Sequence, residues 1–198
     1  PHLSGSAAER IPALPREFLY GPDAAARLAE AFRAHTRMSS VLVFFDQRTR
    51  AVAGKTCLLA MEASGWTVRE RLIPDGDNGS SPVCDDLTMN ELQAGLPTAD
   101  AYLAVGSGVV NDLTKWLAAE NDKPYATFAT AASMNGYAAA NVAPTINNVK
   151  SLFRAKAPVV IAADPAVIAS APSRLTTAGL GDVLAKPVST ADWLMNHQ

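Results

Sequence analysis

The sequence has few of the residues that mark secreted, membrane-spanning or nucleic-acid-binding proteins. Only two of its 198 residues are cysteine, which is typical of reduced thiols in a cytosolic protein. No apolar run approaches the roughly 20 residues of a membrane span, and the first ten residues lack a signal-peptide pattern. Lys and Arg number 17 against 19 Asp and Glu, so there is no basic excess. We expect a cytoplasmic protein with no membrane or nucleic-acid partner.

Local catalytic motifs are also missing. The three histidines and two cysteines show no metal-ligand spacing, and there is no Walker loop, nucleophile elbow or Cys-x-x-Cys pair. Hydrophobic residues make up 48% of the chain and charged residues 18%, a balance typical of a folded globular domain. The length suits one large domain, or one domain with part of a second.

What is present is an alternation of apolar runs and helical stretches. Alternation at this spacing is typical of βαβ units, so the sequence predicts an α/β fold with a mostly parallel sheet and helices on both faces. The expected strands are residues 41–45, 66–73, 101–105, 125–128 and 158–164, and the expected helices are 22–35, 49–64, 83–93 and 109–121. Two further helices are expected at 173–184 and 188–196, with Pro187 as a kink or break between them.

Polar and small residues follow three of the expected strands. Asp46 ends the first, Gly106 to Gly108 follow the third, and Thr130 to Ser133 follow the fourth. Ligands of parallel sheets bind beyond the carboxyl ends of the strands. The pattern therefore predicts that these residues share one ligand site.

The turn Gly106-Ser107-Gly108 is suited to phosphate. Two glycines remove side chains that would block a pyrophosphate, and the helix after the turn directs its positive end at the anion. Asn111 stands where the G-x-G-x-x-G fingerprint has its last glycine. A purely structural strand-to-helix turn is the alternative.

Three carboxylates each have two interpretations. Asp46 can accept a hydrogen bond from an adenosine ribose or cap the helix that follows. Asp112 would repel a pyrophosphate, so bracing the loop or facing the nicotinamide suits it better. Asp182, in a small apolar helix, can bind a metal or form an i,i+4 ion pair with Lys186.

Four segments, taken in order, resemble one known family. They are Gly-Ser-Gly-Val-Val-Asn-Asp-Leu-Thr-Lys at 106–115, Thr-Ala-Ala-Ser-Met-Asn-Gly-Tyr-Ala at 130–138, Lys-Ala-Pro at 156–158 and Ala-Gly-Leu-Gly-Asp at 178–182. Together they are similar to sn-glycerol-1-phosphate dehydrogenases. That family belongs to the superfamily of iron-containing alcohol dehydrogenase, glycerol dehydrogenase and 3-dehydroquinate synthase, and the resemblance covers the chain from about Phe18 onward.

The resemblance implies a Rossmann-like NAD(P)-binding domain over residues 1–170, and the first helices of a helical metal-binding domain over 171–198. It implies hydride transfer between a small polyol or polyol-phosphate and NAD or NADP, and it is compatible with a homo-oligomer. Asn135 would face the substrate, and Asp182 would be the catalytic residue that binds a divalent metal, for which zinc is expected. The cofactor would contact Asp46, Gly106, Ser107, Gly108, Val109, Val110, Asn111, Asp112, Thr130, Ala131, Ala132 and Ser133.

The sequence departs from the family pattern in three places. Asn135 replaces an aspartate, and Ala139 stands where serine is frequent. The family's two metal-binding histidines lie further downstream, and His197 is too close to Asp182 to be either one. We therefore expect two metal ligands outside this chain and no turnover by the chain alone. The alternatives are a lyase related to 3-dehydroquinate synthase and a non-catalytic nucleotide-binding module; an exposed apolar face after Pro172 would count against the second.

Overall fold

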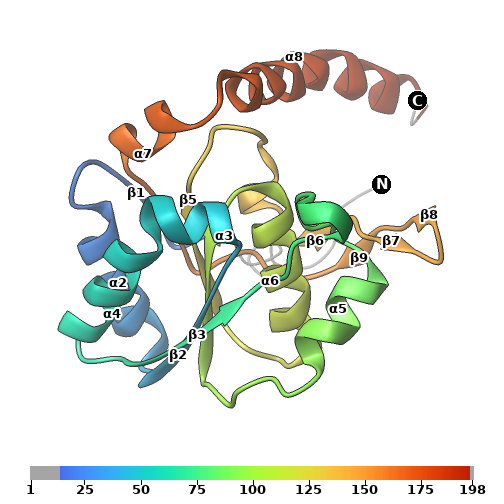
Figure 1. Ribbon diagram of the computed structural model, residues 1–198. Helices are drawn as coiled ribbons and strands as arrows, with labels where there is room; N and C mark the ends of the chain where they lie inside the picture. The colour runs from blue at the N-terminus through green and yellow to red at the C-terminus, as the bar shows by residue number, and fades with distance from the viewer. Residues whose placement is uncertain (1–13, 197–198) are drawn as a thin grey trace, which may run out of the picture.

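A computed structural model describes residues 14–196 of the chain (Figure 1). Residues 1–13, which include His2, and residue His197 lie outside this range. One sheet of six parallel strands forms the centre of the described part, in the order β1-β10-β5-β4-β2-β3. The strands are β1 (Glu17–Tyr20), β2 (Ser40–Phe45), β3 (Thr67–Leu72), β4 (Ala101–Gly106), β5 (Tyr125–Ala129) and β10 (Val160–Ala163).

Helices cover both faces of this sheet, as Figure 1 shows. Side chains alternate along a strand, so β2 sends Val41 and Val43 to one face and Leu42 and Phe44 to the other. The first face packs on α2 (Ala24–Thr36) and on a helical stretch made of α3 (Gln47–Thr49), the π-turn η1 (Arg50–Gly54) and α4 (Lys55–Ala63). The second packs on α5 (Asp86–Gln93) and α6 (Gly108–Glu120).

The strand order reverses between β2 and β4. The chain runs from β2 outward to β3, then returns across β2 to β4 and continues to β5 and β10. The connections after β2 and β4 therefore diverge at their carboxyl ends, which leaves a crevice at that point.

Two short antiparallel pairs and two 3-10 turns complete the core domain. Strand β6 (Asn141–Val142) pairs with β9 (Phe153–Arg154), and β7 (Thr145–Ile146) pairs with β8 (Val149–Lys150). The turn η2 (Asp77–Gly79) follows β3, and η3 (Gly136–Ala138) lies between β5 and β6.

The predicted α/β fold is confirmed, although the short strands β6 to β9 and the helix at residues 165–170 were not predicted. Strand β1 was not predicted, because Phe18 and Tyr20 are 68% and 59% exposed on the sheet edge and the segment has no buried run. Of the two expectations for Pro187, the break is wrong, because α8 (Ser173–Met195) continues through that residue, and the kink stays a prediction. Val183, four residues earlier, is exposed, so water can satisfy the carbonyl that loses its helical donor.

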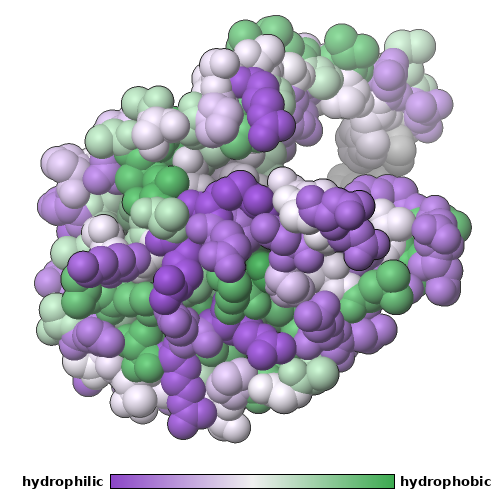
Figure 2. Space-filling view, viewed as in Figure 1, coloured by the Kyte–Doolittle hydropathy of each residue, from purple (hydrophilic) through white to green (hydrophobic). Residues whose placement is uncertain are grey.

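Helix α8 follows the short α7 (Pro165–Ser170) and lies across the carboxyl edge of the sheet (Figure 1). Gly179 is the residue that it buries. A Cβ at Gly179 would lie 1.9 Å from the carbonyl oxygen of Ala132, so the helix touches the loop after β5 backbone to backbone. Figure 2 shows open space between the second half of α8 and the body of the protein. The exposed apolar side chains of this helix are Leu180, Val183, Leu184, Val188, Trp193, Leu194 and Met195.

Within residues 14–196 no helix combines the length and apolarity needed to cross a membrane. Both cysteines are free and buried, Cys57 in the core on one face of the sheet and Cys84 in the core on the other. Burial raises the pKa of the Cys84 thiol to about 12. These thiols are packing residues.

Replacing Gly179 with alanine should loosen α8, although alanine is the better helix former. The new methyl group meets backbone rather than a flexible side chain, so the helix has to shift. We expect faster amide hydrogen exchange over residues 173–182 in G179A. Gly181→Ala is the matched control, since a Cβ there meets nothing within 4 Å; equal exchange in the two variants would contradict the contact.

Candidate functional site

A cavity of about 440 Å³ lies at the crevice between β2 and β4. This volume falls in the range of small-molecule sites, roughly 300–1,000 Å³. The carboxyl ends of β2, β4 and β5 form its floor, and the link between α7 and α8 forms its far wall. The lining residues are Asp46, Arg48, Thr49, Val52, Ser81, Pro82, Ser107, Val109, Val110, Thr130, Ala131, Ser170, Ala171, Pro172, Arg174 and Leu175.

Packing requires glycine at Gly106, the first position of the glycine turn. A Cβ at Gly106 would lie 2.5 Å from the Cβ of Val110, so no other residue lets α6 start this close to β4. The carbonyl of Gly106 also accepts the Thr130 N–H at 3.0 Å, which ties the end of β5 to the turn. Gly106 therefore has a structural role, which brings the start of α6 to the cavity, and phosphate binding at the turn stays a prediction.

The start of α6 offers free hydrogen-bond donors. The first amides of a helix have no acceptor inside the helix, and Ser107 at the N-cap makes no side-chain bond to them. No acidic residue lies in the first turn. A Cβ at Gly108 would meet only the sulfur of Met134, at 3.8 Å. An anion can therefore approach these amides closely, favoured by the helix dipole.

Asp46 caps a helix and lines the cavity at once. Its Oδ1 accepts the Thr49 N–H at 2.7 Å, and its own N–H donates to Thr49 Oγ1 at 3.1 Å. The capping interpretation is thus confirmed. Only 7% of the residue is exposed, and its second oxygen, Oδ2, lies 3.5 Å from Arg48 Nε.

Arg48 was not predicted as a site residue. Its Nη2 lies 2.6 Å from Asp75 Oδ1, so two carboxylates hold the guanidinium at the cavity rim. These bonds raise the pKa of Arg48, the hydrogen bond to Asp75 contributing most. The charged residues that line the cavity are Asp46, Arg48 and Arg174, and Asp75 is not among them.

The loop after β5 is held by bonds at several points. Tyr137, buried, donates its hydroxyl proton to the carbonyl of Ala131 at 2.8 Å. The Asn135 N–H donates to Asp182 Oδ2 at 2.7 Å. Ala132 meets α8 at Gly179. Thr130 and Ala131 face the cavity, whereas Ala132, Ser133 and Asn135 lie on the α8 side of the loop and do not line it.

Asp182 has both of its oxygens engaged. Besides the Asn135 amide on Oδ2, Lys186 Nζ lies 3.1 Å from Oδ1, so the predicted i,i+4 ion pair is present. The Asn135 bond, and after it the Lys186 bond, lower the pKa of Asp182. The carboxylate is thus charged at neutral pH, which is the form that a metal ligand requires.

Asn111 and Asp112 turn away from the cavity into the protein. Asn111 is fully buried and donates from Nδ2 to Asp112 Oδ1 at 3.0 Å. Lys115 Nζ lies 3.8 Å from the same oxygen. Burial raises the pKa of Asp112 against the opposing effect of Lys115. The prediction that Asp112 braces the loop rather than contacting phosphate agrees with this placement.

These residues fit a dinucleotide better than they fit a complete metal site. Free amides at α6, apolar side chains of Val52 and Val109, and a carboxylate at Asp46 are the groups that phosphate, ring and ribose need. A metal would find one carboxylate here, that of Asp182, which is hydrogen-bonded to Asn135 and paired with Lys186. Within residues 14–196 no three His, Cys, Asp or Glu side chains come together as a metal cluster, so further ligands would have to come from elsewhere.

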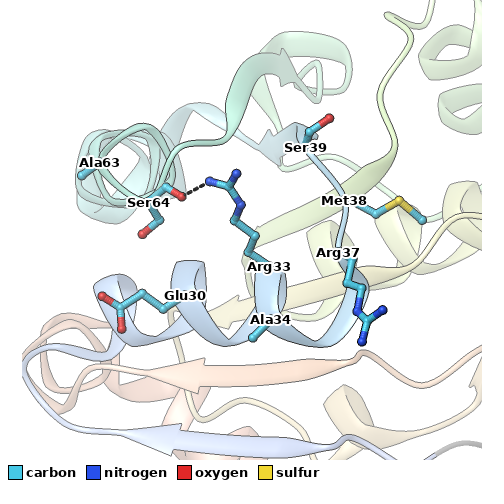
Figure 3. A pocket seen from close by; sticks show the side chains of 8 residues that line it. All are labelled: Glu30, Arg33, Ala34, Arg37, Met38, Ser39, Ala63 and Ser64. Carbon is cyan, nitrogen blue, oxygen red and sulfur yellow. Dashed lines mark hydrogen bonds between the residues drawn. The ribbon is translucent and has the colours of Figure 1, made fainter.

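A second hollow, of about 640 Å³, lies at the opposite edge of the sheet (Figure 3). Strands β2 and β3 begin there, whereas ligands of parallel sheets bind beyond the carboxyl ends of the strands. Figure 3 shows Arg33 reaching from α2 to the carbonyl of Ser64 at the end of α4, to which it donates a hydrogen bond. Because Arg33 is used to cap a helix, we do not assign a ligand site here. The hollow is lined by Glu30, Arg33, Ala34, Arg37, Met38, Ser39, Ala63 and Ser64.

At the sequence level, the chain is similar to curated proteins named glycerol-1-phosphate dehydrogenase (NAD(P)+). The chain is 29% identical over 157 residues to the glycerol-1-phosphate dehydrogenase (NAD(P)+) of Bacillus velezensis, which covers 79% of this chain and 40% of the relative. It is 29% identical over 189 residues to the enzyme of the same name from Pyrococcus furiosus, covering 93% of this chain and 51% of the relative. The chain thus spans about half the length of these curated relatives.

Solved structures agree on the fold. Glycerol dehydrogenase from Schizosaccharomyces pombe superposes with a TM-score of 0.73 at 20% identity, over 89% of this chain and 44% of that one. A 1,3-propanediol oxidoreductase superposes with a TM-score of 0.73 at 18% identity, over 90% of this chain and 51% of that one.

The family model for iron-containing alcohol dehydrogenase matches residues 19–172. The match includes the whole sheet from the end of β1 to β10, the glycine turn and the loop after β5, and it confirms the resemblance found in the sequence. The chain belongs to the iron-containing alcohol dehydrogenase family.

Proposed function

We propose that this chain is the cofactor-binding part of a metal-dependent, NAD(P)-linked dehydrogenase of a polyol or polyol-phosphate. The observation that supports this most directly is the cavity at the carboxyl ends of β2, β4 and β5, into which Asp46, Ser107 and Thr130 all face. Proteins of this family are dehydrogenases, and the curated relatives named above act on glycerol-1-phosphate with NAD(P)+.

Different residues of the cavity would contact different parts of the dinucleotide. The amides at the start of α6, from Gly108 to Val110, would bind the pyrophosphate, with Ser107 at the N-cap beside it. Asp46 would accept a hydrogen bond from the adenosine ribose. Thr130 and Ala131 would contact the nicotinamide half, because they follow β5 on the side toward α8. Bound there, the nicotinamide would exchange a hydride with the substrate carbon.

The substrate would lie between the loop after β5 and α8. Asn135 and Asp182 are joined there by a hydrogen bond, and they would lie beyond the nicotinamide end of the cavity. Asp182 would be one ligand of a divalent metal, whose chemistry would be to polarise the substrate oxygen. We expect zinc, whereas the family's name gives iron; metal analysis of the purified full-length protein distinguishes them.

The exposed apolar side chains of α8 support the expected helical domain. Leu184, Val188 and Met195 are each more than 60% exposed, and contiguous apolar surface of this kind usually meets other protein. The relatives are about twice as long as this chain. We therefore propose that residues 171–198 begin a second, helical domain that supplies the remaining metal ligands. The two free thiols suit the cytoplasmic location that we expect.

The first experiment is a titration of the protein with NADH, followed by the nicotinamide fluorescence. We expect saturable binding at or below millimolar NADH, because the residues that line the cavity all belong to this chain. A folded protein that shows no binding at millimolar NADH would overturn the proposal. The assay needs no metal and no substrate.

A negative charge introduced at Ser107 should weaken phosphate binding without destabilising α6. Aspartate is a favoured N-cap residue, so Ser107→Asp should leave thermal stability equal or higher. It should weaken NADH binding by about tenfold or more, as like charges a few ångströms apart repel. Ser107→Asn is the neutral control of the same shape and should bind nearly as the wild type. Equal affinities in S107D and S107N would place the pyrophosphate elsewhere.

Asp46→Asn should test the ribose contact without breaking the helix cap. The amide oxygen can still accept the Thr49 N–H. NADH affinity should fall by about threefold to tenfold, and the ratio of NADPH to NADH affinity should rise because one negative charge leaves the rim. Asp85→Asn is the matched control, since Asp85 caps α5 through Thr88 in the same way and does not line the cavity. A D46N protein whose ratio of NADPH to NADH affinity equals that of the wild type would contradict the ribose contact of Asp46.

A further inference from the structure

Lys115 has its charged group inside the protein. The residue lies on α6, two turns after the glycine turn, and is 1% exposed. It is among the largest fully buried side chains of the described residues, beside Phe44 and Leu103. It does not line the cavity, so the cofactor site does not account for it.

The ammonium group has three neighbours, and two of them belong to the same loop. Nζ donates to the carbonyl of Gly136 at 3.0 Å and to the carbonyl of Asn141 at 3.2 Å. Asp112 Oδ1 follows at 3.8 Å. The two carbonyls stand at the two ends of the segment 136–141, which contains η3 and leads into β6. One ammonium group therefore hydrogen-bonds both ends of this segment and holds them against α6.

Packing alone does not explain a lysine here. Removing an ammonium group from water is costly, and an apolar residue of similar volume at such a position is frequently neutral or stabilising. Burial lowers the pKa of Lys115, and Asp112 opposes that effect only in part. What a lysine supplies, and a methionine does not, is two directed hydrogen bonds to backbone carbonyls.

The segment 136–141 adjoins the two residues proposed for substrate and metal. Gly136, the first acceptor of Lys115, directly follows Asn135, whose N–H donates to Asp182 Oδ2 at 2.7 Å. Asp182 comes from α8, which meets the rest of the described chain mainly at Gly179. The Gly136 carbonyl that Lys115 binds therefore lies two peptide groups after the Asn135 N–H, on the same short stretch of backbone.

We propose that Lys115 is a positioning residue that fixes the loop 134–141 on α6 and so presents the Asn135 N–H to the carboxylate of Asp182. Through it, the helix that begins at the phosphate turn also sets the orientation of the carboxylate on α8. That this carboxylate serves hydride transfer rests on the proposed function, whereas the positioning itself does not.

The test measures the Asn135 amide directly, by hydrogen exchange and its 1H–15N resonance in the protein without cofactor or metal. In Lys115→Met we expect the Asn135 amide to exchange about tenfold faster, the change that loss of one charge-assisted hydrogen bond produces. Its proton resonance should lose the downfield shift of a carboxylate-bound amide. The amides of the central strand β4 should exchange as in the wild type, because a general loss of stability would accelerate both sets.

Two variants complete the design. Lys115→Arg keeps a buried cation and should restore most of the Asn135 protection. Lys156→Met is the matched control, since Lys156 also pairs with an aspartate, Asp122, but its side chain is 58% exposed and is directed at Asp122 rather than at the carbonyls of the loop; it should leave the Asn135 amide unchanged.

If K115M fails to fold, the double variant D112N/K115M removes both buried charges and is measured in its place. Wild-type exchange of the Asn135 amide in K115M or in the double variant would overturn the proposal, and so would equal acceleration of Asn135 and β4. NADH binding is measured separately, so loss of the proposed function and loss of the positioning are distinguishable.

Discussion

The contact between the backbone of Gly106 and the side chain of Val110 determines where α6 begins. A Cβ at Gly106 would overlap Val110 at 2.5 Å, so the helix can start at this height above the sheet only with glycine there. Its first amides then face the crevice between β2 and β4, where the strand order reverses. The glycine that looks like a phosphate-binding residue in the sequence thus acts one step earlier, by placing the helix end that would bind the phosphate.

The loop after β5 links this turn to α8. Thr130 bonds to Gly106, Asn135 bonds to Asp182, and Lys115 holds the segment that follows Asn135. Each link uses backbone groups, so the geometry tolerates changes of side chain along the loop. Asn135, where the family pattern has aspartate, takes part through its N–H. Asparagine at this position therefore leaves the link intact.

The sequence predicts the sheet and the floor of the cavity, but not its walls. Buried strands such as 41–45 and 101–105 are continuous apolar runs, and the residues that end them must meet at one edge. Arg48 and the α7–α8 link reach the cavity by tertiary packing, for which no local pattern exists. Lys115 lies within a recognised segment, yet lysine is normally exposed, and only the structure shows its ammonium group buried beneath the loop.

The central claim is that a dinucleotide binds at the carboxyl edge of the sheet with its phosphates on α6. The most direct measurement is a 1H–15N spectrum of the protein recorded during titration with NADH. The account predicts saturable shifts of the Gly108, Val109 and Thr130 amides, and no shifts around Arg33 and Ser64 at the opposite edge. Shifts confined to the hollow near Arg33, or none along α6 at saturating NADH, would contradict it.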